Sequence, residues 1–361
     1  MSFYQIFRPA LFKLDAEKAH NLAINFLKFC PRTASIFCAK NNYENLHQKI
    51  WDIDFSSPIG MAAGFDKNAE VALTLEKFGF GFVEVGTVTP KAQSGNDKPR
   101  IFRLEQDQAI INRLGFNNFG ADVFAQNIGQ INRQIKIPLG INIGKNKDTE
   151  SALDDYLPLL RRFYESATYI TVNISSPNTK NLRDLQNENY LDGFLTAIMG
   201  EKNRLKNSSK KNRPVLLKVA PDLSFEEQEK IAAVVLKNQV DGMIISNTTI
   251  DRELNLKSVY ANETGGLSGA PLFKKSNEVL KNFYKLTNGK IPLVGVGGVS
   301  SADDVFEKIR CGASLVQIYS AFIYQGFGLV EKIKKELSLK LQTQGVQNIS
   351  QLIGANVKSA N

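Results

Sequence analysis

The sequence contains few of the residues that build metal and disulfide sites. Its 361 residues include three cysteines, Cys30, Cys38 and Cys311, and two histidines, His20 and His47. No two cysteines have CxxC spacing, which argues against structural zinc, an iron–sulfur cluster and a disulfide framework, and fits a reducing compartment. Both histidines precede residue 50, so a catalytic domain beyond that point works without imidazole. His-based triads and His-rich metal sites are excluded there, and we expect no metal.

Long apolar segments are also lacking. No run of about 18 apolar residues occurs, so the sequence predicts no transmembrane helix. The N-terminus has no short basic leader followed by an uninterrupted apolar core, as a signal peptide would. With 43% hydrophobic and 22% charged residues, the composition is typical of a globular protein with a full core, either one large domain or two ordinary ones.

The net charge is +9, which raises the question of nucleic-acid binding. The lysines are scattered rather than striped, and most lie on expected helix faces, so we expect no nucleic-acid partner. A solvated basic surface is the simplest interpretation. Attraction to anionic lipid or to an acidic metabolite comes next.

Short apolar, β-branched segments alternate with amphipathic ones. The sequence predicts strands at 59–63, 82–86, 139–143, 169–174, 215–219, 242–246, 293–296 and 315–319. Helices are expected between them, including 69–78, 153–164, 225–238 and 302–311. This alternation is typical of an α/β protein with a closed (β/α)8 TIM barrel. A doubly wound open sheet is the alternative, but it concentrates its ligand site at one switch point, whereas polar motifs here follow nearly every strand.

Three further segments depart from the alternation. Residues 100–112 are expected to form a hairpin, and residues 250–272 a long functional connection. Residues 1–40 are expected to form an N-terminal extension of two amphipathic helices, the second capped by Asp15. These helices either pack on the outside of the barrel or rest on a membrane with an apolar face open to lipid or a lipophilic ligand, and their many aromatic residues favour the second. The expected domains are this extension, the barrel at 41–340, and a polar, frayed tail at 341–361.

The most informative segment is 172–179, VNISSPNT, where a β-branched strand stops at an uncharged polar loop. Serine, proline and asparagine are ordinary turn formers, so a plain turn is the simpler interpretation. Loops after barrel strands nevertheless often carry chemistry. Similar junctions end the other strands, at 61–68, 86–90, 142–146, 218–222, 246–249, 295–298 and 317–320, and a further polar segment, 112–118, follows the expected hairpin.

These junctions together indicate a flavin site. Lys218 lies inside an apolar strand and must meet an anion or a polar ligand, because an unpaired buried charge is costly. The loops after the seventh and eighth strands of such barrels often bind phosphate, and the glycines at 295, 297 and 298, with those at 265, 266 and 269, favour a phosphate-bearing cofactor. Lysines, amides and a phosphate cradle without histidine suit FMN, and the remaining asparagines suit a planar, anionic, amide-rich substrate.

The chain resembles the quinone-dependent (class 2) dihydroorotate dehydrogenases over nearly its whole length. The resemblance rests on six segments: AGFDK at 63–67, NRLGFN at 112–117, NIGKN at 142–146, NISSPNT at 173–179, SNTT at 246–249 and GVGG at 295–298. It implies oxidation of (S)-dihydroorotate to orotate in the synthesis of UMP, with FMN as the hydride acceptor and a membrane quinone as the final electron acceptor.

The resemblance also implies roles for individual residues. Ser176 would be the catalytic base, where class 1 enzymes have cysteine. The substrate would be held by Lys67, Asn112, Arg113, Leu114, Gly115, Phe116, Asn173, Asn178, Asn247 and Thr248. FMN would be held by Ala63, Gly64, Phe65, Asp66, Lys67, Thr87, Asn142, Asn173, Lys218, Ser246, Gly269, Gly298, Tyr319 and Ser320.

A serine hydroxyl is far from ionised at neutral pH, and general bases work best with a pKa near the operating pH. We therefore expect Ser176 to pass its proton onward, through Thr179 or a water, while Lys67 and the flavin stabilise the developing charge.

In class 2 enzymes a similar N-terminal extension forms a quinone tunnel and rests on the membrane, and Arg103 and His20 are expected near that tunnel. Mitochondrial relatives carry a transit peptide and a membrane span ahead of these helices, whereas this sequence starts directly at them. The resemblance therefore favours peripheral contact with an anionic membrane, at the cytoplasmic face of a bacterial inner membrane. Two departures from the family, Phe65 where leucine is common and GFG at 326–328 in place of a proline turn, do not touch the chemistry.

The alternatives are a class 1 enzyme that uses fumarate or NAD, and a non-enzymatic, membrane- or RNA-associated barrel.

Overall fold

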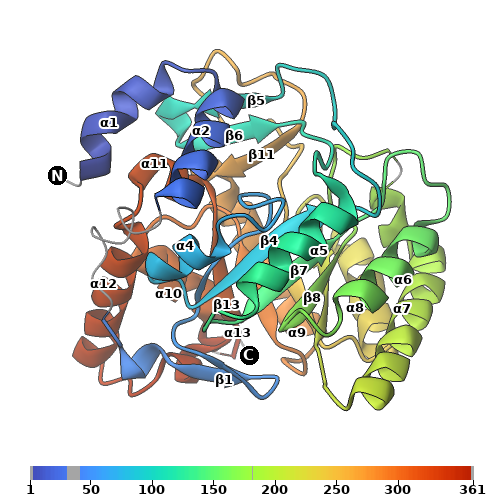
Figure 1. Ribbon diagram of the computed structural model, residues 1–361. Coiled ribbons are helices and arrows are strands. Elements are labelled where there is room, and N and C mark those ends of the chain that lie inside the picture. The colour runs from blue at the N-terminus through green and yellow to red at the C-terminus, as the bar shows by residue number, and fades with distance from the viewer. Residues whose placement is uncertain (1–2, 31–40, 181, 359–361) are drawn as a thin grey trace.

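A computed structural model describes residues 3–30, 41–180 and 182–358. Eight parallel strands close into a barrel in the order β10-β12-β13-β3-β4-β7-β8-β9 (Figure 1). They are β3 (Ile59–Met61), β4 (Phe82–Val88), β7 (Leu139–Ile143), β8 (Tyr169–Asn173), β9 (Val215–Val219), β10 (Gly242–Ile245), β12 (Leu293–Val296) and β13 (Ala313–Ile318). The predicted strands lie within two residues of these bounds, and the TIM barrel is confirmed.

Helices surround the barrel on its outside (Figure 1). They are α4 (Ala72–Lys77), α5 (Gly120–Ile131), α6 (Ala152–Phe163), α7 (Glu188–Ser209), α8 (Phe225–Lys237), α9 (Phe273–Leu286), α10 (Ala302–Arg310), α11 (Ser320–Gln325) and α12 (Leu329–Thr343). Each amphipathic helix buries one stripe, as α6 does with Tyr156, Leu159, Leu160 and Phe163. The α8 helix begins with a capping box formed by Ser224 and Glu227.

The amino-terminal end of the barrel is closed by an antiparallel hairpin, β1 (Gln48–Ile50) and β2 (Ile53–Phe55). Its Phe55 packs edge-on against Phe82, with ring centroids 5.5 Å apart, in a buried cluster that includes Tyr169. Trp51 donates a hydrogen bond to Asp241 O at 2.8 Å and fixes the hairpin to the barrel. The carboxyl end of the barrel is therefore the end left for ligands.

A three-stranded sheet lies at that carboxyl end. The predicted hairpin is confirmed as β5 (Ile101–Leu104) and β6 (Ala109–Asn112), and the long connection at 250–272 supplies an unpredicted third strand, β11 (Gly266–Gly269). The register pairs Gly266 with Asn112 and Gly269 with Ala109. This sheet holds the long connection against the barrel.

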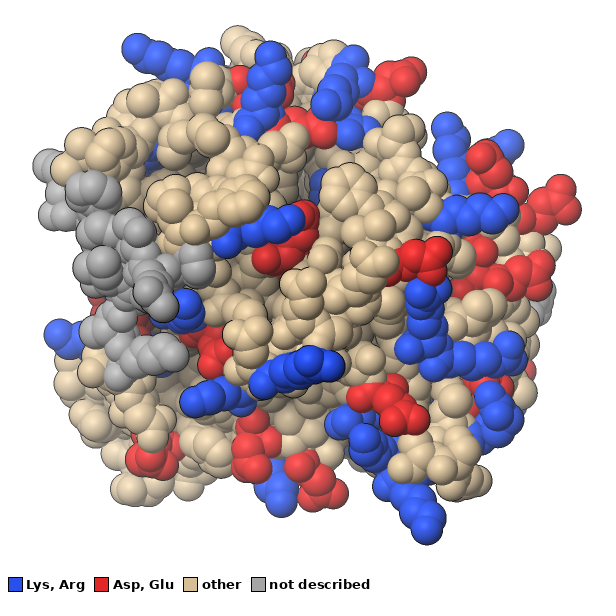
Figure 2. Space-filling view, viewed as in Figure 1, with Lys and Arg blue, Asp and Glu red and all other residues tan. Residues whose placement is uncertain are grey.

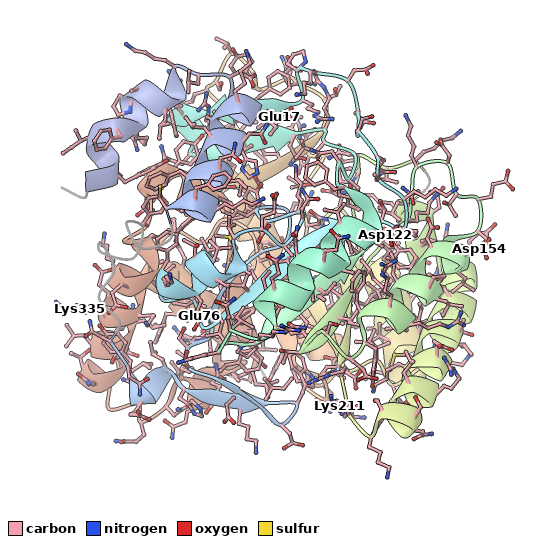
Figure 3. The ribbon with its side chains drawn as sticks, in the orientation of Figure 1. Glu17, Glu76, Asp122, Asp154, Lys211 and Lys335 are labelled. Atoms are coloured by element: carbon pink, nitrogen blue, oxygen red, sulfur yellow. The ribbon has the colours of Figure 1, made fainter. Side chains whose placement is uncertain are left out.

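The two predicted N-terminal helices are present as α1 (Phe3–Phe12) and α2 (Ala16–Phe29), and Asp15 caps α2 as expected. Both lie beside the three-stranded sheet (Figure 1). Figure 3 shows Glu17 beside that sheet, where it pairs with Arg100 at 2.7 Å. Both side chains are buried, so the pair anchors α2. Among the described residues, no helix combines the length and the apolar character needed to cross a bilayer.

The expectation of a frayed tail after residue 340 is wrong for the described residues of that segment. The α12 helix continues to Thr343, and a 3-10 helix (Ile349–Leu352) and α13 (Ala355–Lys358) follow. Ile349 and Val357 are buried, and Gly354 N donates to Ile309 O at 3.1 Å. Apolar side chains spaced along a polar sequence are enough to fix this segment on the barrel.

Candidate active site

A cavity of about 320 Å³ opens at the carboxyl end of the barrel, lined by strand ends and by the three-stranded sheet. Ser176 and Lys218 both line it. Most of the other predicted site residues line it too: Ala63, Gly64, Lys67, Thr87, Asn112, Leu114, Gly115, Phe116, Asn173, Asn178, Ser246, Asn247, Thr248, Gly269, Gly298, Tyr319 and Ser320. The structure therefore brings segments from the whole barrel to one place.

Asn142 does not line the cavity but lies beneath it. Its oxygen accepts hydrogen bonds from Thr87 Oγ1 at 2.6 Å and Asn173 Nδ2 at 3.2 Å, and its Nδ2 donates to Glu84 at 2.8 Å. Glu84 is fully buried and also accepts from Gln317 at 2.9 Å. This network fixes side chains that do line the cavity. Glu84 was missed, although a carboxylate within an apolar strand was as clear a signal as Lys218.

Phe65, Asp66 and Arg113 also lie outside the cavity lining. The Asp66 carboxylate accepts from the backbone N–H groups of Glu70 and Val71 at 2.7 and 2.8 Å. Burial raises the pKa of Asp66 to about 6, against the effect of these backbone hydrogen bonds. Arg113 pairs with Glu263 at 2.7 Å. These contacts hold the loops around the cavity.

His20 and Arg103 join the N-terminal helices to the rim of the site. The His20 ring packs edge-on against Phe65, with centroids 5.5 Å apart. Burial, together with the nearby charge of Lys67, lowers the pKa of His20 to about 3, so the ring is neutral near pH 7. Arg103 lies over the ring of Phe12 at 4.7 Å and donates to Phe12 O at 3.0 Å.

Two lysines give the cavity positive charge. Lys218 is 4% exposed, and its ammonium has no hydrogen-bond acceptor among the residues that the structure describes. Burial lowers the pKa of Lys218, and Glu84 opposes that shift. Lys67 donates to Asn117 Oδ1 at 2.8 Å, and burial lowers the pKa of Lys67 to about 8. The site is therefore suited to an anionic ligand.

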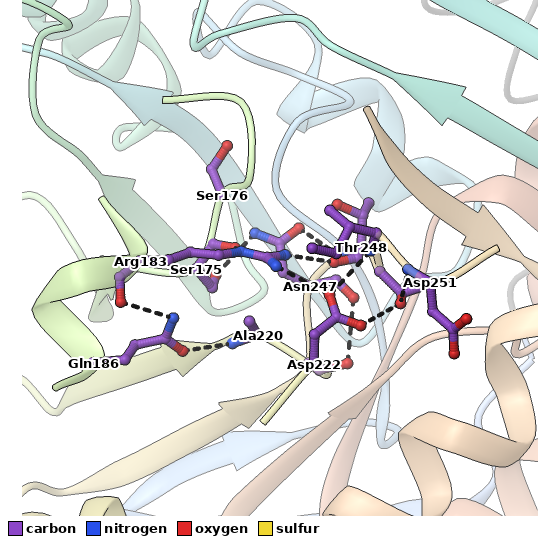
Figure 4. A network of polar contacts seen from close by, with 12 residues as sticks. Ser175, Ser176, Arg183, Gln186, Ala220, Asp222, Asn247, Thr248 and Asp251 are labelled. Atoms are coloured by element: carbon purple, nitrogen blue, oxygen red, sulfur yellow. Dashed lines mark hydrogen bonds and ion pairs between the residues drawn. The ribbon is translucent and has the colours of Figure 1, made fainter. Parts of the chain in front are cut away.

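The two serines of the loop after β8 point in different directions. The Ser175 hydroxyl donates to Asn173 Oδ1 at 2.8 Å and accepts from Asn247 Nδ2 at 2.8 Å. Ser176 stands apart from that network (Figure 4) and accepts only from Asn178 N, at 3.3 Å, among the described residues. The buried Thr179 Oγ1 likewise has no hydrogen-bond partner among the residues that the structure describes. The Ser176 oxygen is therefore available to a ligand.

Arg183 clamps this loop to the neighbouring strand ends (Figure 4). Its guanidinium donates to Ser175 O, Asp222 Oδ2 and Thr248 O, each at 3.0 Å. Asp222 also accepts from Ile250 N at 3.0 Å. Arg183 was not predicted, because nothing in the local sequence distinguishes it from a surface arginine.

Glycines form the opposite wall of the cavity. Gly297 and Gly298 follow β12 with φ angles of +113° and +74°, and Gly269 has a φ of +104°. A Cβ atom at Gly298 would lie 2.5 Å from that of Phe273. Only glycine fits such a backbone, which leaves peptide groups open to a ligand.

Positive and negative side chains are interspersed over the face seen in Figure 2, and no stripe of one sign crosses it. This agrees with a solvated basic surface.

A family model described as dihydroorotate dehydrogenase matches residues 45–341. The chain is 47% identical to the dihydroorotate dehydrogenase (quinone) of Idiomarina loihiensis over 92% of this chain and 100% of that protein. It is also 47% identical to that of Brucella anthropi, over 99% and 96% of the two chains. The solved structure of DHODH from Eimeria tenella in complex with ferulenol superposes with a TM-score of 0.89 at 40% identity, covering 95% of this chain and 96% of that one.

Proposed function

Because the chain belongs to the dihydroorotate dehydrogenase family, we infer that it is a flavin-dependent enzyme that oxidises dihydroorotate to orotate in pyrimidine biosynthesis, with a quinone as electron acceptor. The observation that carries this function is the meeting of Ser176, Lys67 and Lys218 in one cavity.

We propose FMN as the flavin. The Lys218 ammonium without an acceptor fits an anionic or carbonyl-rich ring system, and the open peptide groups at Gly298 and Gly269 fit a phosphate. Thr87 and Asn173, which Asn142 holds in place, would supply hydrogen bonds to the ring. When bound, FMN would supply the acceptor for the hydride that leaves C6 of the substrate.

Dihydroorotate would bind between the flavin and the loop after β8. Lys67 supplies a positive charge, and Asn178, which donates to Asn112 O at 3.0 Å, belongs to a group of amides suited to the substrate's ring. Asn247 and Thr248 complete that group from the end of β10.

Ser176 would take the proton from C5 as the C5=C6 double bond forms. The Ser176 hydroxyl oxygen accepts one hydrogen bond, which Asn178 N donates. The oxygen therefore has a second lone pair that can receive the substrate's proton while the hydroxyl proton leaves. The unpartnered Thr179 hydroxyl offers a route onward through a water.

Quinone access would come through the N-terminal helices. Ile6, Phe7, Leu14, Leu22, Phe26 and Phe29 are exposed large apolar side chains on or beside α1 and α2. We propose that the N-terminal extension, expected at residues 1–40 and described at 3–30, rests through α1 and α2 on the cytoplasmic face of the inner membrane and admits a lipophilic quinone.

The test uses the full-length chain under anaerobic conditions. Dihydroorotate is expected to bleach the bound flavin, and a soluble quinone to restore its colour faster than fumarate or NAD does. Ser176→Ala is expected to slow the bleaching by about 100-fold or more at unchanged flavin content. Faster reoxidation by fumarate would indicate a class 1 enzyme, and a colourless purified protein would favour the non-enzymatic alternative.

A further inference from the structure

Lys308 is a fully buried lysine to which the proposed function gives no role. It lies on α10, and its side chain is 0% exposed. Its ammonium donates to Ser276 Oγ at 2.6 Å, reaches Val296 O at 3.5 Å and lies 5.4 Å from the centre of the Phe273 ring. Among the described residues no carboxylate lies within 4.0 Å of it. A buried ammonium without a directly paired anion is costly.

The side chain of Lys308 runs along β12 toward the glycine turn of the cavity. A Cβ atom at Gly295 would lie 3.0 Å from Lys308 Cδ, and one at Gly297 would lie 2.9 Å from Ser276 Oγ. These two glycines therefore leave room for the lysine and for its serine partner. The charge therefore ends directly behind the turn at Gly297 and Gly298.

The Lys308–Ser276 pair also orients that turn. An ammonium can only donate, so Ser276 Oγ accepts from Lys308 and keeps its own proton for the carbonyls within reach, Gly297 O at 3.1 Å and Phe273 O at 3.0 Å. In a trans peptide the C=O and N–H groups point in opposite directions. Holding Gly297 O toward Ser276 therefore turns the N–H of Gly298 away from the helices. Gly298 lines the cavity, and its N–H has no backbone acceptor among the described residues.

We propose that Lys308 is a positioning residue for the cofactor's phosphate: its charge lies behind the Gly297–Gly298 turn, and through Ser276 it aims the N–H of Gly298 at the anion. This inference rests on the proposed function, since it assigns the anion to FMN. Burial lowers the pKa of Lys308 to about 7, although Cys311 and Asp304 favour its charged form. A bound phosphate would favour the charged form further.

The test compares FMN with riboflavin, which lacks the phosphate. The full-length chain is freed of flavin and titrated with each compound, and the ratio of the two affinities is measured by quenching of flavin fluorescence. Lys308→Met is expected to lower the preference for FMN by at least about tenfold, because a buried charge acts through a medium of low dielectric constant. Lys334→Met is the matched control: Lys334 is buried on α12 and pairs with Glu331 at 3.1 Å, so the ratio should not change.

A merely structural role for Lys308 would weaken FMN and riboflavin equally, and an unchanged ratio in the variant would overturn the inference. If Lys308→Met does not fold, Ser276→Ala removes the hydroxyl that links the lysine to Gly297 O and should lower the ratio of FMN to riboflavin affinity by about fivefold. An unchanged ratio in Ser276→Ala would also overturn the inference. Failure of the wild-type chain to bind FMN at all would overturn the proposed function, and this inference with it.

Discussion

Replacing Arg183 with methionine tests whether the loop after β8 must be clamped for catalysis. The arginine donates to Ser175 O, Asp222 Oδ2 and Thr248 O, each at 3.0 Å. Methionine keeps most of the aliphatic volume and removes the three hydrogen bonds. Asp222 does not become an unpaired charge, because Lys275 remains 2.9 Å away. The main effect should therefore be a looser loop and not an unfolded barrel.

The structure sets the size of that effect. The Arg183 side chain is 21% exposed, so each of its three hydrogen bonds contributes about 1 kcal/mol net, below the value for a fully buried charged group. Together they favour the closed loop by about 3 kcal/mol, which corresponds to roughly 100-fold in the closed-to-open ratio. Because Ser176 adjoins Ser175, flavin reduction by dihydroorotate should slow by about 10- to 100-fold.

Stopped-flow absorbance measures the two half-reactions separately. Reduction by dihydroorotate should slow, and reoxidation by quinone should not, because the clamp holds only the substrate side of the site. Arg204→Met is the control, since Arg204 is an exposed α7 residue that pairs with Glu201 three residues away. Equal slowing of both half-reactions, or of neither, would refute the clamp.

Two further predictions concern charge at the cavity and the exposed helices. Because the pKa of Lys67 is lowered to about 8, its ammonium loses its proton as the pH rises through that value, and kcat/KM for the anionic substrate should fall there. Lys67→Arg should move the fall to higher pH, because guanidinium stays charged; a profile that does not move would exclude Lys67 as its origin. The double variant Leu22→Glu and Phe26→Glu should lose about tenfold or more in cosedimentation with anionic lipid vesicles. It should reduce its flavin at the wild-type rate, whereas undiminished vesicle binding would rule out this face as the membrane contact.

The barrel could be predicted because each strand carries its own signal, a short β-branched run that ends at polar residues. Lys218 was predicted in the site from an equally local signal, because it is a charged residue within an apolar, β-branched strand. Glu84 has the same signal within β4 and should have been recognised. Asp66 and Asn142, both predicted to hold the cofactor, do not line the cavity. Asp66 accepts from the backbone of Glu70 and Val71, and Asn142 accepts from Thr87 and Asn173, and the local sequence does not show these partners.

Other features could not be predicted because their partners are distant in the sequence. The strand β11 is glycine-rich, and its pairing with β6 joins residues such as Leu267 and Ile111. Arg183 acts on Asp222 and Thr248, which lie beyond the next strand or two. Lys308 occurs in a helical pattern where a lysine ordinarily faces solvent, and only the fold shows that it points inward.

The pairing of β13 with β3 closes the barrel between its first and last strands, and this has a consequence for how the protein is made. The cavity draws residues from Ala62 to Gln325, so a chain still on the ribosome cannot form the complete pocket until the residues up to Gln325 have emerged. Until β13 emerges, β3 and β12 are open sheet edges that other chains can pair with. The flavin pocket is therefore complete only after β13 has paired with β3, and truncations that remove β13 should yield aggregated protein instead of a soluble form without flavin.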